Sequence, residues 1–541
     1  MIEKTDEVGE ITRMRLYRDE GWSDKSMVKK TYYDFMKEIS PEELYDKLVE
    51  HGIFSEKLPP IFSGREFLDY CKNERKYSFA DTWYGYISYE NIRNINIPRD
   101  IGIPNPMGYE LLCKCLADNW SKIIDYFKEK TEEQQKIVSR IHIRKMRDTD
   151  ALFEMNYKNW RIDGTPEPDI YIGKRYMVHA DISKCYQSIY THAIPWALVG
   201  REESKKNVHN EKEWYNELDH YVQNLKNGET HGILIGPHAS HIIAEIILCA
   251  VDSHLTKEYQ YYIRNIDDYT CFTDSRDEAE QFLMTLDRRL REFGLSLNYK
   301  KTEIQELPIC VAETWINEIQ NRVAMFQKNK DYVDYKEIRA YINFIIGLSS
   351  ENNDNQSILY YAVKVIKDFN LTPNAKIYLV KSMVSLALLY PYLVPILDEY
   401  IFKVYAVDNE SIGEYANLIF DKYMEKNTYE ACSYAILYAI DSNLKINNFD
   451  LDKIIKSKDC ILWLLALIYC RKNELKSEIK CLKKLAKDIV EAAKSIQSNE
   501  EIDRYWLFIY EALPYESLND DWVSMKKAGV SFLKDKYRNR K

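Results

Sequence analysis

The stretch Tyr261-Tyr-Ile-Arg-Asn-Ile-Asp267-Asp268-Tyr-Thr-Cys-Phe272 decides how this 541-residue chain is interpreted. Its apolar and aromatic residues are typical of a β-strand, yet two adjacent carboxylates interrupt the run. Two like charges side by side in a buried sheet are costly unless something pairs them. A tight hairpin that presents both aspartates to a divalent cation removes this cost, and a solvated Asp-Asp turn is the plainer alternative.

A third aspartate, Asp181, ends an earlier strand-like run that begins at Tyr176. Between the aspartates, the loop Gly236-Pro237 leads into a helix with an apolar face, and a second helix after the pair stops near Gly294. A short strand toward Pro308 follows. The order strand, helices, hairpin, helix, strand predicts a split βαβ, ferredoxin-like sheet that brings Asp181 beside Asp267.

Three carboxylates at one point predict a site for two Mg²⁺ ions, with Mn²⁺ as an alternative. Such ions take oxygen ligands and keep several waters. One ion activates an attacking hydroxyl and the other stabilises a leaving pyrophosphate, which is the chemistry of nucleotidyl transfer. The predicted catalytic carboxylates are therefore Asp181, Asp267 and Asp268.

Four motifs, in this order, resemble motifs A to D of reverse transcriptases. They are Asp181-x-Ser-x-x-Tyr186, Gly232-x-x-x-Gly236-Pro237, the Asp267-Asp268 hairpin and Leu297-x-x-Lys-Lys301-Thr302. The resemblance covers about residues 95 to 310 and implies a palm and fingers, with Ile182 joining the three aspartates in the metal-binding set. One position departs from the pattern, because Asn265 stands where the usual Tyr-x-Asp-Asp has its tyrosine.

Three further stretches resemble the bacterial abortive-infection (AbiK-like) and related defence-associated reverse transcriptases. These are Ser188-Ile-Tyr-Thr-His192-Ala-Ile-Pro-Trp196, Gly236-Pro-His-Ala-Ser240-x-Ile-Ile-Ala-Glu245 and Ile103-Pro-Asn-Pro106. The resemblance implies antiphage defence, DNA synthesis from dNTPs, homo-oligomers and a C-terminal helical-repeat domain in place of a thumb. In the AbiK-like branch it also implies untemplated synthesis from a protein side chain, so that the DNA product is covalently attached.

The resemblance also assigns roles around the nucleotide. Tyr186 would exclude a ribose 2′-OH, Arg144 and Arg147 would meet the triphosphate from the fingers, and Gly236 and Pro237 would line the nucleotide site. Lys301 would protonate the leaving pyrophosphate as a general acid. The plainer alternatives are a core tyrosine, a solvated arginine face and a simple phosphate contact by Lys301. We interpret His179 and His192 as structural.

The chain divides into three parts on these patterns. Residues 1–95 are expected to form a mostly helical N-terminal extension of the fingers, 96–325 the fingers and palm, and 326–541 an α-helical repeat domain. No glycine or proline occurs between Glu414 and Leu513, which favours helices. The fold class is therefore α+β. The basic segment Lys526–Lys541 is expected either to track a nucleic-acid backbone or to be a solvated tail.

Composition narrows the function. A net charge of −10 argues against simple coating of nucleic acid, but a polymerase needs only a local basic channel. The eleven cysteines are scattered, with no C-x-x-C, and the charged N-terminus has no apolar signal core, so we expect a cytoplasmic protein without a membrane segment. Two alternatives to the protein-primed defence polymerase stay open: a templated reverse transcriptase that copies a dedicated noncoding RNA, and an inactive oligomeric scaffold. The priming residue also stays open among 43 tyrosines.

Overall fold

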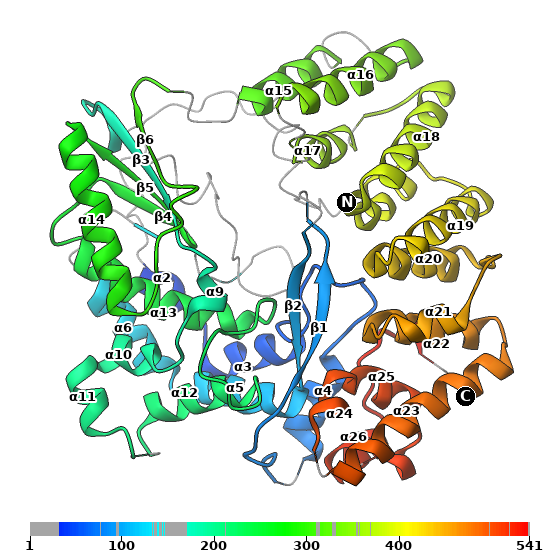
Figure 1. The fold of residues 1–541 in the computed structure, drawn as a ribbon, viewed down its shortest axis with the longest axis horizontal. Coiled ribbons are helices and arrows are strands. Elements are labelled where there is room, and N and C mark those ends of the chain that lie inside the picture. The colour runs from blue at the N-terminus through cyan, green and yellow to red at the C-terminus, as the bar shows by residue number, and fades with distance from the viewer. Residues whose placement is uncertain are drawn as a thin grey trace.

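The structure is a computed structural model that describes residues 32–538, with gaps at 76, 94–96, 133, 135–137, 140–142, 144, 146–169, 211, 310–313, 327–331, 353–354, 356, 368, 497 and 519. It is a mixed α+β protein with small antiparallel sheets, in which a helical region follows the central sheet (Figure 1). The predicted α+β class and the helical C-terminal region are therefore confirmed.

The N-terminal part is mostly helical and carries a hairpin. Its elements are α2 (Tyr32–Met36), α3 (Pro41–Glu50), α4 (Arg65–Asp69), the π-helical turn η1 (Tyr70–Glu74), β1 (Tyr86–Asn91), β2 (Arg99–Pro104), α5 (Pro106–Asp118) and α6 (Trp120–Thr131). Strands β1 and β2 pair antiparallel, from Tyr86 opposite Pro104 to Asn91 opposite Arg99. Asn105 caps α5 by accepting from the backbone N–H of Met107, and Pro106 occupies the first helical position, where its missing N–H costs nothing.

The central part contains the four-stranded sheet. Its elements are β3 (Tyr176–Asp181), α9 (Cys185–Ser188), α10 (Ala193–Val199), α11 (Arg201–Lys206), α12 (Trp214–Asn224), α13 (His238–Leu255), β4 (Tyr262–Asn265), β5 (Asp268–Thr273), α14 (Arg276–Glu292) and β6 (Glu303–Glu306). The strand order is β4-β5-β3-β6, with every neighbouring pair antiparallel. The order expected from the sequence, a strand, helices, a hairpin, a helix and a strand, is confirmed.

Local sequence explains the two helices beside this sheet. Ser275 caps α14 by accepting from the N–H of Glu278, and Gly294 follows the helix with a φ of +78°. Helix α13 is apolar almost all round, and 14 of its 18 residues are buried. A helix of that kind belongs in the interior, and α13 packs against α6, α10 and α14.

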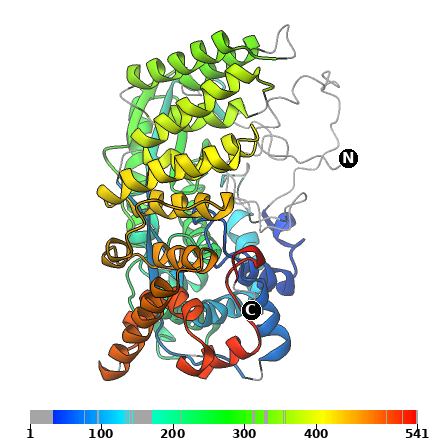
Figure 2. The same cartoon turned by 90° about the vertical axis from the view of Figure 1, so that its right-hand side faces the viewer.

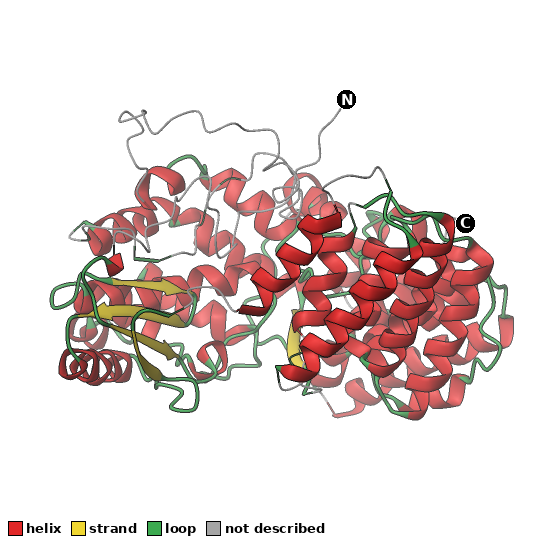
Figure 3. Cartoon of the chain, turned by 90° about the horizontal axis from the view of Figure 1, so that it is seen from above, coloured by secondary structure: helices red, strands yellow, loops and turns green. Residues whose placement is uncertain are grey.

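The C-terminal part is a succession of helices that stack one below another (Figures 1 and 2). They are α15 (Thr314–Phe326), α16 (Tyr335–Glu351), α17 (Ser357–Ile366), α18 (Pro373–Leu389), η2 (Pro391–Ile396), η3 (Asp398–Phe402), α19 (Asn409–Glu425), α20 (Tyr429–Ser442), α21 (Leu451–Lys456), α22 (Cys460–Lys472), α23 (Lys476–Ile496), α24 (Glu500–Arg504), α25 (Trp506–Ala512), η4 (Tyr515–Ser517), α26 (Asp520–Lys527) and η5 (Asp535–Tyr537). Seen from above, they lie beside the part that holds the four-stranded sheet (Figure 3).

Two buried carboxylates fasten this helical region to the β1–β2 hairpin. Glu430 of α20 accepts from the backbone N–H of Ile92 over 2.7 Å, just past the end of β1. Asp503 of α24 accepts from the N–H of Gly85 over 2.7 Å, just before β1 begins. Asp503 also accepts from the side-chain amide of Asn105 over 2.7 Å. The helical region therefore holds both ends of β1.

The basic segment at the C-terminus returns to the N-terminal helices. Lys534 donates its backbone N–H to the carbonyl of Ile61 over 2.8 Å, and Leu533 forms a β-bridge with Phe62. Arg538 pairs with Glu66. Residues 530–538 are thus packed against the protein rather than left as a solvated tail. Within the described ranges, no helix has the length and apolar character needed to cross a membrane.

Candidate active site

Three aspartates meet where β3 ends and β5 begins. Asp181 is the last residue of β3, Asp268 is the first residue of β5, and the two are direct partners in the antiparallel register. Asp267 lies in the turn between β4 and β5. The backbone N–H of Ile182 donates to the carbonyl of Asp267 over 3.0 Å, which fastens the turn to the end of β3. The structure therefore brings the four predicted residues together.

The segment after α14 closes over Asp181. Lys301 Nζ lies 2.9 Å from Asp181 Oδ2, and the side-chain amide of Asn298 donates to Asp181 Oδ1 over 2.8 Å. The backbone N–H of Asn298 also donates to the Asp181 carbonyl over 2.7 Å. Lys301 is thus placed at the carboxylates, as predicted. No role is predicted for Asn298 from the sequence. Its place between Leu297 and Lys301 in the fourth motif is the signal that could have indicated one.

The carboxylates repel one another in a partly dry environment. Burial, followed by the negative charges of Asp267 and Asp181, raises the pKa of Asp268 to about 7. Burial and the charge of Asp181 also raise the pKa of Asp267. The hydrogen bond with Asp181 raises the pKa of the Lys301 ammonium, so this side chain stays charged at neutral pH. Among the described residues, the charges of Lys301 and, at Asp267, of Arg99 oppose three acids, which leaves the site short of positive charge.

This shortage fits a divalent cation. The three side chains offer carboxylate oxygens, which are the ligands that Mg²⁺ prefers. In the described part of the chain, no group of three or more His, Cys, Asp or Glu side chains is placed to hold a metal ion as it stands. Asp181 is instead engaged by Lys301 and Asn298. A cation at Asp181 Oδ2 would therefore have to share that oxygen with the ammonium or displace it.

His179 lies closer to the carboxylates than the sequence interpretation implied. It shares a strand face with Asp181, two residues away, and its Nε2 is 4.0 Å from Asp268 Oδ1. His192 is engaged elsewhere, since its Nδ1 lies 2.5 Å from Asp219 Oδ2. Hydrogen bonding to that carboxylate raises the pKa of His192. Of these two histidines, only His179 lies within 4.0 Å of a carboxylate of the aspartate cluster.

Tyr186 has a fixed hydroxyl. It lies in α9, half-buried, and its Oη is 2.6 Å from Nδ1 of His241 in α13. The two rings meet edge to face, with centroids 5.6 Å apart. Burial lowers the pKa of His241 to about 4, so the imidazole is neutral, and a hydrogen bond joins its Nδ1 to the phenol of Tyr186. The ring of Tyr186 is thereby held in one orientation, as a steric gate would need.

The Gly236-Pro237 loop is built by close packing. Gly236 has a φ of +124°, and a Cβ at this position would stand 2.9 Å from Ile101 Cγ2. Pro237 immediately precedes α13, and no described side chain caps the first turn of this helix. The loop runs beside Tyr186, whose carbonyl accepts from the N–H of Ile233 over 2.8 Å. The remaining predicted nucleotide contacts, Arg144 and Arg147, lie outside the described residues.

Asn265, the residue at the departure from the usual pattern, ends β4 beside the turn. Its side-chain Oδ1 is buried and accepts no hydrogen bond from the described residues. The position thus lacks the tyrosine ring of the usual motif, and no described residue donates to the amide oxygen that replaces it.

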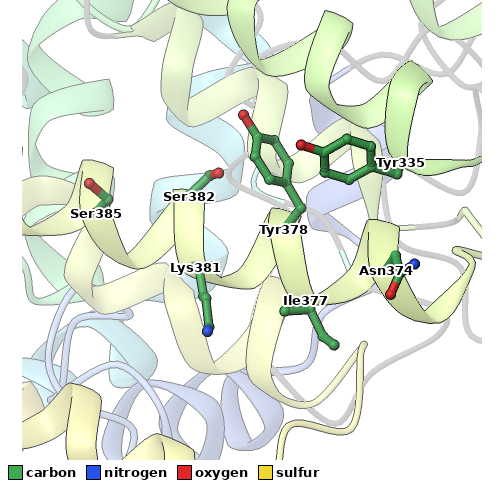
Figure 4. Close-up of a pocket in the computed structure, with 7 residues that line it drawn as sticks. All are labelled: Tyr335, Asn374, Ile377, Tyr378, Lys381, Ser382 and Ser385. Atoms are coloured by element: carbon green, nitrogen blue, oxygen red, sulfur yellow. The ribbon is translucent and has the colours of Figure 1, made fainter.

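A separate pocket of about 540 Å³ lies far along the chain, on α16 and α18 (Figure 4). Its most prominent feature is the pair Tyr335 and Tyr378, whose rings meet edge to face at 5.0 Å. The lining contains no carboxylate, so it cannot supply ligands of the kind found at Asp181. The lining residues are Tyr335, Asn374, Ile377, Tyr378, Lys381, Ser382 and Ser385.

Comparison with known families identifies the class of the central part. Residues 114–335 match the family model described as reverse transcriptase (RNA-dependent DNA polymerase). The central part of the chain is therefore similar to a reverse transcriptase domain. This domain holds Asp181, the Asp267-Asp268 turn and Lys301. No curated protein matches the sequence.

Solved structures of telomerase show a distant likeness. For apo telomerase from Candida tropicalis, the identity is 12%, the TM-score is 0.31, and 70% of this chain and 67% of that chain are covered. For the form truncated from its C-terminal domain, the identity is 13% and the TM-score is 0.27, and 42% of this chain and 51% of that chain are covered. For telomerase from Candida albicans in complex with a TWJ fragment of telomeric RNA, the identity is 11% and the TM-score is 0.24, and 69% of this chain and 64% of that chain are covered. The chain thus spans between about half and two thirds of these structures, and TM-scores this low carry no argument about its function.

Proposed function

We propose that this protein is an antiphage-defence DNA polymerase of the reverse-transcriptase type. It joins dNTPs by two-metal nucleotidyl transfer and starts from a hydroxyl of its own chain. The observation that carries the catalytic part is the pairing of Asp181 with Asp268 across β3 and β5, with Asp267 in the adjoining turn. This arrangement gathers three carboxylates at one strand end, where they can bind divalent cations that in turn bind the phosphates of a nucleotide.

Asp181, Asp267 and Asp268, with the backbone of Ile182, would hold two Mg²⁺ or Mn²⁺ ions. When bound, such ions supply positive charge to the phosphoryl oxygens and lower the pKa of an attacking hydroxyl. The raised pKa of Asp268, about 7, supports this assignment, because carboxylates that repel one another are stabilised by a shared cation.

Lys301 and Tyr186 would act on the nucleotide itself. The Lys301 ammonium stays protonated at neutral pH and sits at the carboxylates, so it can donate a proton to the departing pyrophosphate. Tyr186, held by His241, would stand against the sugar and exclude a 2′-OH. Gly236 and Pro237 would form the adjoining wall, where the absence of a side chain at Gly236 allows close packing.

Priming from the protein is supported by the order of elements after the sheet. A thumb that holds a primer would be expected after β6, but the next described element, α15, already belongs to the helical stack. The first α-phosphate still needs a hydroxyl nucleophile, and a tyrosine phenol ionises more easily than a serine. The resemblance to AbiK-like enzymes supports this mode, together with untemplated synthesis, homo-oligomers and a role in defence.

The test is to purify the protein from cells, digest it with nuclease and protease, and search the peptides for a nucleotide on tyrosine or serine. The same preparation of Asp267→Asn serves as the control. A nucleotide adduct that is present in the wild type and absent in the variant supports protein priming. Free DNA without any adduct contradicts it.

A templated reverse transcriptase is the second candidate, and the family description as an RNA-dependent DNA polymerase favours it. Sequencing of nucleic acid that copurifies with the protein separates the two. One defined RNA together with its complementary DNA supports the templated enzyme, whereas DNA without a matching RNA supports untemplated synthesis. Phage protection by an Asp181→Ala variant that makes no DNA would instead support the third alternative, an inactive oligomeric scaffold.

A further inference from the structure

One arginine lies wholly inside the protein, directly behind the aspartate turn. Arg264 of β4 has an exposure of 0%. Its Nε and Nη2 both donate to Asp252 Oδ2, over 2.8 and 2.6 Å. Nη2 and Nη1 donate to the two carboxylate oxygens of Glu245, over 2.9 and 3.0 Å. Nη1 also donates to the carbonyl of Ile266 over 3.0 Å. A guanidinium has five N–H groups, and these five bonds use all of them.

The fifth bond is made to a residue in an unfavourable conformation. Ile266 immediately precedes Asp267 and has a φ of +57°. The left-handed region is costly for any residue with a Cβ and unusual for a β-branched one. Such a conformation persists only where its surroundings impose it. Arg264 holds the carbonyl of this residue, and so it orients the peptide group that joins Ile266 to Asp267.

The acceptors that hold Arg264 come from a different element. Glu245 and Asp252 both lie on α13, two turns apart and fully buried. Tyr269 of β5 adds a hydrogen bond from its hydroxyl to Asp252 Oδ1 over 3.3 Å. The side chain of Arg264 is therefore fixed from the helix side, and the turn is fixed by Arg264.

A purely structural ion pair would explain only part of this arrangement. Buried ion pairs often contribute little net stability, because the cost of desolvation offsets the attraction. One guanidinium also needs only one carboxylate for charge balance, and here it has two. Burial, together with the charge of Glu245, raises the pKa of Asp252. The fork geometry, in contrast, gives a fixed direction to the remaining N–H, and that N–H points at Ile266.

We propose that Arg264, held by Glu245 and Asp252, is a positioning residue that locks the Ile266–Asp267 turn and thereby sets the affinity of the aspartates for divalent cations. The inference rests on the proposed function, since it assumes that Asp267 and Asp268 bind such ions. Arg264 does not reach the cation; it acts through the backbone of the turn.

The experiment measures Mn²⁺ binding to the full chain by electron paramagnetic resonance, without nucleotide. Arg264→Lys keeps the charge but replaces the planar fork by a single nitrogen, which cannot reproduce five bonds that leave from three nitrogens. We expect Arg264→Lys and Glu245→Gln to raise the Kd for Mn²⁺ by about 10- to 100-fold, the usual effect of removing a residue that orients a metal ligand. Tyr262→Phe is the matched control. It deletes buried hydrogen bonds of 3.0 Å to the Thr256 hydroxyl and 3.2 Å to the backbone carbonyl of Asp252, but keeps the carboxylates that hold Arg264 and the bond to Ile266. Its Kd should stay at the wild-type value.

A rescue separates positioning from stability. Glycine adopts positive φ without steric cost, so the turn of an Ile266→Gly chain no longer depends on Arg264. Adding Ile266→Gly to Arg264→Lys should therefore restore much of the Mn²⁺ affinity. No restoration, or an equal loss of affinity in Tyr262→Phe at a matched melting temperature, would overturn the positioning role.

Failure of the underlying site gives a different result. If wild type and Asp267→Asn bind Mn²⁺ equally, the proposed metal site itself is wrong. If Asp267→Asn loses Mn²⁺ while Arg264→Lys and Glu245→Gln keep the wild-type Kd, only the positioning role is wrong. Should Arg264→Lys fail to fold, the comparison of Glu245→Gln with Tyr262→Phe decides.

Discussion

Replacing Gly236 by alanine should destabilise the protein and impair DNA synthesis together. The backbone at Gly236 has a φ of +124°, which side-chain-bearing residues rarely adopt. Its new Cβ would also stand 2.9 Å from Ile101 Cγ2 and 3.3 Å from the carbonyl of Gly102. Backbone strain of about 1–3 kcal/mol and overpacking of about 1–3 kcal/mol give a total of about 2–6 kcal/mol. The strain falls on the loop that leads into α13 beside Tyr186, so nucleotide incorporation should fall as well.

A second glycine provides the control for this substitution. Gly347 lies within α16, and a Cβ added there would meet nothing within 4 Å. Gly347→Ala should therefore stabilise the protein by about 0.5–1 kcal/mol through helix propensity alone. Thermal unfolding of the two variants should show shifts of opposite sign, and only Gly236→Ala should lose dNTP incorporation. A Gly236→Ala protein that melts at or above the wild-type temperature and polymerises normally would refute the reasoning.

Four further outcomes are expected. Asp267→Asn and Asp181→Ala should each abolish dNTP incorporation while circular dichroism stays unchanged, because nucleotidyl transfer needs both carboxylates; near wild-type synthesis by either would remove the assignment. Tyr186→Ala should admit ribonucleotides, and an unchanged dNTP preference in an active variant would make this residue a core tyrosine. In the folded protein the pKa of Asp268 is raised to about 7 from its ordinary 3.8, so the folded state binds a proton here more tightly than the unfolded state does. This contribution to stability is present at low pH and is lost as pH rises toward 7. Asp268→Asn should therefore raise the melting temperature of metal-free protein at pH 8 more than at pH 5, and identical shifts at both pH values would contradict this. The Mg²⁺ concentration that the wild type needs for activity should increase as pH falls below 7. Truncation after residue 325 should reduce both assembly and activity, and a soluble truncated chain with the native oligomer and normal synthesis would count against it.

The sheet and its aspartates could be predicted because their signals are local. An Asp-Asp pair inside a strand-like run predicts a hairpin, and helices of clear periodicity on either side define the strand order. Asp181 pairs with Asp268 once that order is known, since strand ends meet in an antiparallel sheet. Lys301 follows from its place in the fourth motif. Each of these signals spans only a few residues, and their order along the chain supplies the rest.

Arg264 could not be assigned in the same way. In the sequence it is one charged residue in a strand-like run, and its partners Glu245 and Asp252 stand on another element. The signal that was available is their spacing: two acids seven residues apart on a helix that is otherwise apolar almost all round. Acids on such a helix are buried with it and need a cation. The sequence contains no local sign of which cation that is.

The docking of the helical region was equally hidden. Glu430 and Asp503 occur in helices where a carboxylate is usually exposed or forms a cap, but each accepts a backbone N–H at an end of β1. These contacts join residues more than 300 positions apart, so no periodicity reveals them. The basic C-terminal segment illustrates the same point, because Lys534 donates to the carbonyl of Pro60 and Arg538 pairs with Glu66.

These long-range contacts connect the helical region to the aspartates. Glu430 and Asp503 hold β1, and β1 pairs with β2 along its whole length. In β2, Gly102 donates its N–H to the carbonyl of Ile235 over 2.8 Å, next to Gly236. The helical region therefore supports the Gly236-Pro237 loop through one hairpin.

The same path continues to the Ile266–Asp267 turn. Pro237 precedes α13, α13 carries Glu245, and Glu245 holds the guanidinium that fixes Ile266 beside Asp267. Each step is a hydrogen bond or a continuous element, so displacement of the hairpin can be transmitted to Asp267 and Asp268 without any contact between the helices and a nucleotide. Loss of activity on truncation after residue 325 would then arise from the turn, and Mn²⁺ affinity should fall along with polymerisation. If the truncated chain bound Mn²⁺ as tightly as the full chain but made no DNA, the helical region would act on nucleic acid or on assembly instead.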